Sequence, residues 1–188
     1  ASVTSFGRQM IDTTKNYVEE HYPETKVIYG DTDSVMILCD KDGKDKDLTQ
    51  REKLEKSMAF GVAAAAKVTE EFIAPIKLEF EKVYYPFLLM NKKRYAGLYW
   101  TQPENYDRLD AKGIETVRRD NAPLVATVLS GVLNRILIQH SVESAKAYVK
   151  GIVTDLLMNR IDISQLIISK AFSKADSEYA NKQAMARA

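Results

Sequence analysis

Residues 26–38 read KVIYGDTDSVMIL, and this stretch decides the fold. Two short apolar arms, at 27–29 and 35–38, flank the polar centre GDTDS. Arms rich in β-forming residues around a turn-forming centre are typical of a hairpin. The sequence therefore predicts a β-hairpin that carries Asp31 and Asp33 at its tip.

These two aspartates are the sharpest candidates for chemistry. Carboxylates separated by one residue at a tight turn raise each other's pKa unless a cation intervenes. Magnesium is the natural cation for hard oxygen ligands that also hold a phosphate, and paired metal ions about 3.5–4 Å apart serve in-line phosphoryl transfer. Asp is also a common turn residue, so the pattern Asp31-Thr32-Asp33 alone is compatible with an ordinary turn.

Helices are predicted on both sides of the hairpin because apolar side chains recur there with a helical period. The predicted helices cover residues 2–21, 49–72, a segment that starts at 123, and 141 to about 160. Thr49 followed by Glu52 forms a capping-box pattern at the start of the second helix. Ser141 is expected to cap the last one.

Three further strands are predicted between these helices. Residues 76–83 alternate between apolar and charged side chains, which is typical of a half-buried strand. Residues 83–90 and 94–100 follow as two strands that turn at Asn91 and Lys92, and Pro86 makes the first an edge or bulged strand. The fold class is therefore α+β, an antiparallel sheet packed on helices.

Composition limits the functions that remain. The chain has 188 residues with 27 Lys or Arg and 26 Asp or Glu, so it lacks the strongly basic character of a free-standing nucleic-acid binder. Its single cysteine, Cys39, excludes a disulfide framework and favours a reducing compartment. No apolar run is long enough for a membrane span, and no membrane partner is expected. The absence of an initiator Met and the polar C-terminus lead us to expect a piece of a longer protein.

The segment YGDTDS at 29–34, between its apolar arms, resembles motif C of family B DNA polymerases. The resemblance implies that Asp31 and Asp33 are catalytic, with Asp33 the firmer metal ligand and Asp31 beside it. The string LEFEKVY at 78–84 is similar to the segment after motif C and adds Glu81 as a third carboxylate near two Mg²⁺ ions. A solvated strand face is the alternative interpretation of the acids in this string.

A basic stretch, NKKRYAG at 91–97, resembles the family segment that lies against the primer–template duplex. KGIE at 112–115 and VRRD at 117–120 resemble the junction between palm and thumb. The resemblance implies DNA contacts from Tyr29, Gly30, Lys92, Lys93, Arg94, Tyr95, Lys112, Arg118 and Arg119. Lys and Arg neutralise phosphates or donate to minor-groove acceptors, which are nearly the same for every base pair. A solvated basic turn is the alternative interpretation.

The resemblance covers nearly the whole chain. It implies that residues 1–115 are the C-terminal half of a polymerase palm and that residues 116–188 begin the thumb. The implied activity is that of a nuclear, DNA-directed DNA polymerase that uses deoxynucleoside triphosphates and two Mg²⁺ ions. The implied partners are primer–template DNA, the rest of the polymerase chain, accessory subunits and a sliding clamp. The family's motif A aspartate and motif B lysine are not in this sequence, so the chain alone is expected to be inactive.

Alternative functions stay open at this point. Within the family, the strings KRYAGL and NRIDIS favour a replicative eukaryotic member over polymerase zeta, and a viral enzyme is the other alternative. Outside the enzymes, the basic stretch is compatible with a non-catalytic DNA-grip module.

Overall fold

The computed structural model describes residues 2–114 and 121–169. The chain divides into two compact units, Ala1–Gly113 and Ile114–Ala188, and each is described by itself. The first unit contains α1 Ser2–His21, β1 Lys26–Asp31, β2 Ser34–Leu38, η1 Lys44–Asp47, α2 Gln50–Thr69, β3 Val83–Asn91, β4 Arg94–Trp100 and β5 Arg108–Lys112. The second contains α3 Pro123–Leu137, α4 Val142–Leu157 and η2 Ile163–Leu166.

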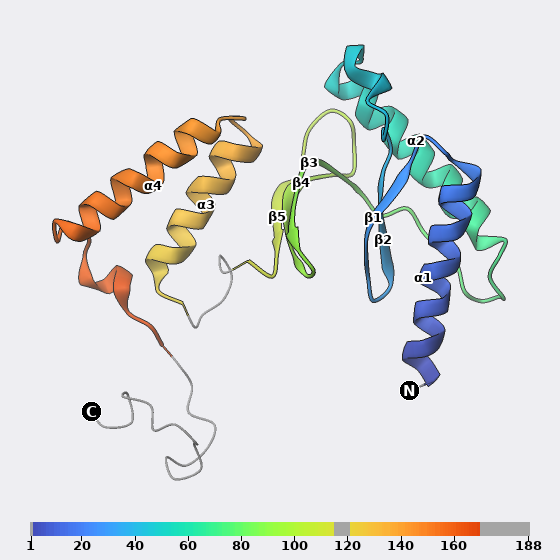
Figure 1. Ribbon diagram of the computed structural model, residues 1–188, viewed down its shortest axis with the longest axis horizontal. Coiled ribbons are helices and arrows are strands. Elements are labelled where there is room, and N and C mark those ends of the chain that lie inside the picture. The colour runs from blue at the N-terminus through green and yellow to red at the C-terminus, as the bar shows by residue number, and fades with distance from the viewer. Residues whose placement is uncertain (1, 115–120, 170–188) are drawn as a thin grey trace, which may run out of the picture. The chain divides into compact units, whose positions relative to one another are not determined.

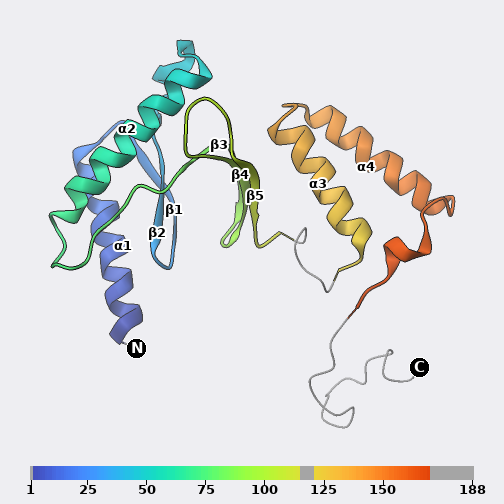
Figure 2. The ribbon, with the colours of Figure 1, turned by 180° about the vertical axis from the view of Figure 1, so that it is seen from behind.

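The α+β class is confirmed, but the first unit has two antiparallel sheets rather than the single sheet that was predicted. One sheet is the hairpin β1–β2, and the other has the order β3–β4–β5. In both ribbon views the hairpin lies between α1 and the three-stranded sheet (Figures 1 and 2). The hairpin therefore has a helix on one side and the three-stranded sheet on the other.

The predicted hairpin forms with its two aspartates at the tip. Asp31 pairs with Ser34, and the backbone of Thr32 turns through a φ of 49°. Helix α1 supports the hairpin from behind, with Thr14 and Val18 buried on its inner face. The segment between the apolar arms thus forms a tight turn, while the arms pair with each other and pack against α1.

Helix α2 starts at the predicted capping box. The Thr49 hydroxyl accepts from the backbone N–H of Glu52, and the Glu52 carboxylate accepts from the backbone N–H of Thr49 at 2.7 Å. Two backbone donors that the helix itself cannot satisfy are thereby paired. Leu54 and Val68 bury the inner face of the helix.

The prediction of a strand over residues 76–83 is wrong. In the described part of the chain, residues 76–82 pair with no strand, and β3 begins only at Val83. The alternation reported burial correctly, because Leu78 and Phe80 are half-buried while Glu79 and Glu81 are exposed. The Thr69 hydroxyl takes the place of a neighbouring strand. It accepts from the Leu78 N–H at 2.9 Å, and its single proton is shared between the Ala65 carbonyl at 2.8 Å and the Leu78 carbonyl at 3.2 Å. Alternation predicts which side is buried but not which partner satisfies the backbone.

The three-stranded sheet has β4 at its centre. Strand β3 lies at the edge and its register shifts between Tyr84 and Phe87, so both expectations drawn from Pro86 are confirmed. In β4, Trp100 is 4% exposed, and its indole N–H donates to the Tyr85 carbonyl at 2.6 Å. Strand β5 was not predicted, because five residues of mixed character carry little periodic signal.

The second unit is a pair of helices, as expected from Pro123 onward. Helix α4 is capped by Ser141, whose hydroxyl accepts from the Ser144 N–H at 3.1 Å. Between the helices, the Arg135 guanidinium lies 3.8 Å from the centre of the Tyr148 ring. No helix in the described part of the chain is long and apolar enough to cross a bilayer.

Candidate functional site

The hairpin tip and the turn between β3 and β4 meet in the folded chain. The backbone N–H of Lys93 donates to the Tyr29 hydroxyl at 2.8 Å, although the two residues are 64 positions apart. The Lys93 ammonium lies 3.4 Å from the Asp31 carboxylate, and the rings of Tyr29 and Tyr95 are 5.9 Å apart. Four residues that the sequence singled out for metal or DNA binding thus form one cluster.

Asp31 accepts hydrogen bonds from two neighbouring hydroxyls at the tip. Its carboxylate accepts from the Thr32 hydroxyl at 3.2 Å, and its backbone carbonyl accepts from the Ser34 hydroxyl at 3.2 Å. The side chain is 27% exposed, whereas that of Lys93 is 73% exposed. Ion pairs with so exposed a partner contribute about 0–1 kcal/mol, so another cation can replace Lys93 at little cost.

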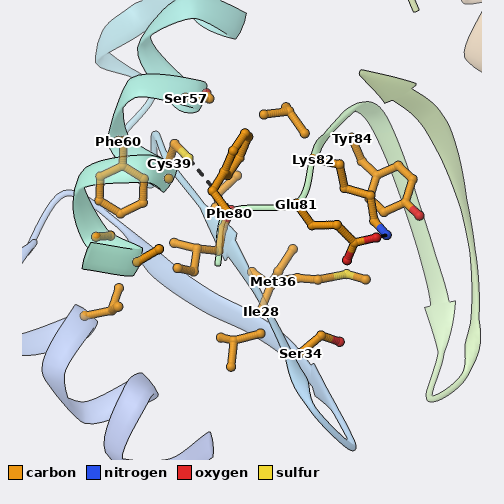
Figure 3. A pocket seen from close by; sticks show the side chains of 18 of the residues that line it. Ile28, Ser34, Met36, Cys39, Ser57, Phe60, Phe80, Glu81, Lys82 and Tyr84 are labelled. Carbon is orange, nitrogen blue, oxygen red and sulfur yellow. Dashed lines mark hydrogen bonds and ion pairs between the residues drawn. The ribbon is translucent and has the colours of Figure 1, made fainter. Parts of the chain in front are cut away.

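Asp33 faces a different environment from Asp31. It is exposed and borders a cavity of about 740 Å³ that also has Glu81 in its wall. Figure 3 shows Glu81 next to Lys82 on the side of the cavity toward Tyr84. The Lys82 ammonium lies 2.6 Å from the Glu81 carboxylate. Glu81 and Asp33 therefore share a cavity, and Asp31 is not among the residues that line it.

The structure does not gather the three predicted carboxylates into one group. Among the residues that it describes, no three His, Cys, Asp or Glu side chains lie close enough to hold a metal ion. Asp31 and Glu81 each pair with a lysine instead. The donor set at the tip still fits magnesium, which commonly takes one or two carboxylates together with substrate phosphates. The three-acid site stays a prediction.

The remaining predicted basic residues lie at one end of the three-stranded sheet. Lys92 is exposed in the turn, Arg94 begins β4, and Lys112 ends β5 opposite Tyr95. Gly30 lies in β1 opposite Val35. The sheet thus presents several cations beside the hairpin tip. Arg118 and Arg119 lie outside the described residues.

Asp110 is a buried acid that sequence reasoning missed. The Tyr84 hydroxyl donates to its carboxylate at 2.5 Å, and the Lys112 ammonium lies 3.7 Å from the other oxygen. Burial first, and then the hydrogen bond to Asp110, raise the pKa of Tyr84 well above its usual value. Burial, followed by the charges of Asp110 and Asp31, raises the pKa of Tyr95. An acid at the centre of the short segment RLDAK is the only signal that the sequence offers.

Lys82 is a second residue that sequence reasoning passed over. Its ammonium lies 5.4 Å from the centre of the Tyr84 ring and 5.1 Å from that of Tyr99. The side chain is 17% exposed. Aromatic faces and the neighbouring Glu81 thus hold this cation partly out of water.

The sequence of the whole chain, residues 1–188, matches DNA polymerase family B. The chain belongs to this family of polymerases. It is 54% identical over 190 residues to the DNA polymerase delta catalytic subunit of Drosophila melanogaster, covering 97% of this chain and 16% of that protein. It is 54% identical over 191 residues to the Candida albicans protein of the same name, with 98% and 17% covered. Identity to the Schizosaccharomyces pombe counterpart is 51% over 191 residues, with 98% and 16% covered. The chain thus spans a small part of the length of these relatives.

Proposed function

We propose that this chain is part of a replicative, DNA-directed DNA polymerase of the delta type. Residues 1–115 would form the C-terminal half of its palm, and residues 116–188 would begin its thumb. The family match and the identity to delta catalytic subunits support this proposal. The observation that carries it is the contact of Asp31 in the YGDTDS hairpin with Lys93 of the basic turn, because it joins candidate metal ligands to candidate DNA ligands.

The hairpin supplies the acidic half of the proposed site. Asp33 and Asp31 would hold Mg²⁺ through hard carboxylate oxygens, with Glu81 as the third acid. When bound, two Mg²⁺ ions would supply charge stabilisation for in-line attack of a primer 3′-hydroxyl on the α-phosphate of a deoxynucleoside triphosphate. The protein's own contribution is to hold the carboxylates at a tight turn. The paired strands β1 and β2 fix this turn from either side.

The basic turn and the end of the sheet supply the DNA-binding half. Lys92, Lys93, Arg94 and Lys112 would neutralise phosphates of the primer–template duplex, while Tyr29 and Tyr95 offer flat side chains beside them. Contacts of this kind are independent of base sequence, as a replicative enzyme requires. Nuclear localisation, accessory subunits and a sliding clamp belong to the same proposal, and the relatives' designation as catalytic subunits supports further subunits.

The test is primer extension by the full-length polymerase that contains this chain. Asp33→Asn keeps the size of the side chain but removes its charge, and we expect the extension rate to fall on the order of a hundredfold or more. Glu19→Gln, on the exposed face of α1, is the matched control and should extend primers at the wild-type rate. Wild-type extension by Asp33→Asn would refute the metal-binding role and favour a non-catalytic DNA grip.

A further inference from the structure

The Lys92–Lys93 turn is held from two sides. On one side its backbone is bonded to the Tyr29 hydroxyl, as described above. On the other side lies Gly113, directly after β5. A Cβ atom on Gly113 would lie 1.8 Å from the Lys93 carbonyl oxygen and 2.9 Å from its carbon. Both neighbours are backbone atoms, so no side chain at position 113 fits unless the turn moves.

The backbone of Gly113 adds a second requirement for glycine. Its φ is +65°, in the left-handed region that residues with side chains rarely adopt. With this conformation the chain leaves β5 at the point where Gly113 approaches the Lys93 carbonyl. The close approach and the conformation together make position 113 specific for glycine.

The end of β5 is itself fixed in the sheet. Tyr95 pairs with Lys112, one residue before Gly113. Two residues further back, the carboxylate of Asp110 accepts the hydrogen bond of Tyr84, which reaches across β4 from β3. Buried charge-assisted hydrogen bonds of this length are among the strong ones in proteins. Strand β5 is therefore a firm base for the turn.

We propose that Gly113 is a positioning residue that holds the Lys92–Lys93 turn against the hairpin tip, so that this turn and the proposed metal-binding carboxylates keep one fixed spacing. This inference rests on the proposed function. Gly113 would touch neither DNA nor metal and would act only through Lys93. The hydrogen bond from the Lys93 N–H to the Tyr29 hydroxyl then links the turn, and through it β5, to the hairpin.

The inference is tested by a double-mutant cycle in the full-length polymerase. The variants are Gly113→Ala, Tyr29→Phe and the double variant. The dissociation constant of a fluorescent primer–template is measured by anisotropy, without magnesium. We expect Gly113→Ala to weaken binding about tenfold and Tyr29→Phe, which loses one hydrogen bond, about two- to tenfold. Because both break the same link, the double variant should bind no more weakly than the weaker-binding single variant.

A matched control is available in α4. A Cβ on Gly151 would meet nothing within 4 Å, so Gly151→Ala should bind primer–template like the wild type. Wild-type binding by Gly113→Ala, or effects of Gly113→Ala and Tyr29→Phe that multiply in the double variant, would overturn the inference. If the wild-type protein itself does not bind primer–template, the proposed function fails. If Asp33→Asn is inactive while Gly113→Ala binds normally, only this inference fails.

A second measurement protects the test against misfolding. Hydrogen exchange of the Lys93 amide should accelerate in Tyr29→Phe, because that amide loses its acceptor. If thermal denaturation shows that Gly113→Ala does not fold, Asp110→Asn replaces it in the cycle, since it weakens the anchor of β5 without straining position 113. Faster exchange of the Lys93 amide in Asp110→Asn, with weaker primer–template binding, supports the inference. Unchanged exchange and unchanged binding contradict it.

Discussion

The ammonium of Lys93 lies 3.4 Å from the carboxylate of Asp31, across 62 positions of sequence between a basic turn and an acidic hairpin tip. Without metal or DNA, each group partly neutralises the other. A metal ion at the tip would compete with Lys93 for Asp31, and a DNA phosphate at the turn would compete with Asp31 for Lys93. The affinities for the two proposed ligands, metal and DNA, are therefore linked.

Lys93→Met should separate the two affinities in the full-length polymerase. Asp31 loses a competing cation, so the Mg²⁺ concentration for half-maximal primer extension should fall. Primer–template binding should weaken, and the slope of log affinity against log salt should become shallower by about one. Lys15→Met, at an exposed position of α1, is the control and should change neither quantity. A higher magnesium requirement in Lys93→Met would contradict the linkage.

The capping box at Thr49 should be visible in stability. Thr49→Ala removes the hydroxyl that accepts from the Glu52 N–H, and we expect the free energy of unfolding to fall by about 1 kcal/mol. Thr49→Ser keeps a hydroxyl and should stay close to the wild type. Urea denaturation followed by circular dichroism measures both. Equal stability of the Ala and Ser variants would show that the hydroxyl contributes nothing.

Two helical glycines should respond in opposite ways to alanine. Gly151→Ala should stabilise the second unit by up to about 1 kcal/mol, because Ala favours helix and nothing crowds the position. Gly61→Ala gains the same preference, but its Cβ would lie 2.3 Å from the Phe80 ring. We expect a net loss of about 1 kcal/mol or more in the first unit. Thermal denaturation of the two variants measures both effects. A stabilised Gly61→Ala would show that the Phe80 ring can move aside without cost.

Cys39 should react slowly. Burial raises the pKa of its thiol above the ordinary value of 9.0, an effect that the hydrogen bond with Ser57 only partly offsets. Alkylation by iodoacetamide at pH 8 should therefore be slower than that of a free thiol, and unfolding in urea should restore the normal rate. The sign for stability follows from the same shift. The folded state holds the proton more tightly, so this contribution is present below pH 9.0 and is lost as the pH rises through the folded pKa.

The isolated chain should associate through the hairpin. Within the described residues, β1 and β2 pair only with each other, so each has an open edge. Ser34–Leu38 carries neither Pro nor Lys, and a net charge of +1 gives little repulsion. Sedimentation velocity over a concentration series should show self-association, and Met36→Lys in β2 should reduce it. A monomer at high concentration would show that the edge is protected.

Sequence reasoning worked where a local rule fixes the answer. The hairpin at 26–38 was predicted because turn residues sit between β-forming arms, and the start of α2 because Thr49 and Glu52 satisfy each other. The strand expected at 76–83 failed, because a side-chain hydroxyl from Thr69 satisfies Leu78 where a strand was assumed. Periodicity detects burial, whereas backbone pairing depends on a distant partner.

The candidate site divides along the same line. The residue types at Asp31, Asp33 and Lys93 were identified from short motifs, and their roles rest on resemblance. That Lys93 meets Tyr29, that Gly113 lies beneath Lys93 and that Asp110 anchors β5 all depend on tertiary contacts between distant segments. No local pattern encodes such contacts, so they emerged only from the fold.

Trp100 gives this chain a built-in optical reporter. It is the only tryptophan in the sequence, it is 4% exposed, and its indole is bonded to the Tyr85 carbonyl in the three-stranded sheet. Its emission therefore reports the melting of the three-stranded sheet. Far-ultraviolet ellipticity, by contrast, is dominated by helices from both units. Comparing the two signals during one denaturation tells whether the sheet and the helical pair lose their structure together or in succession.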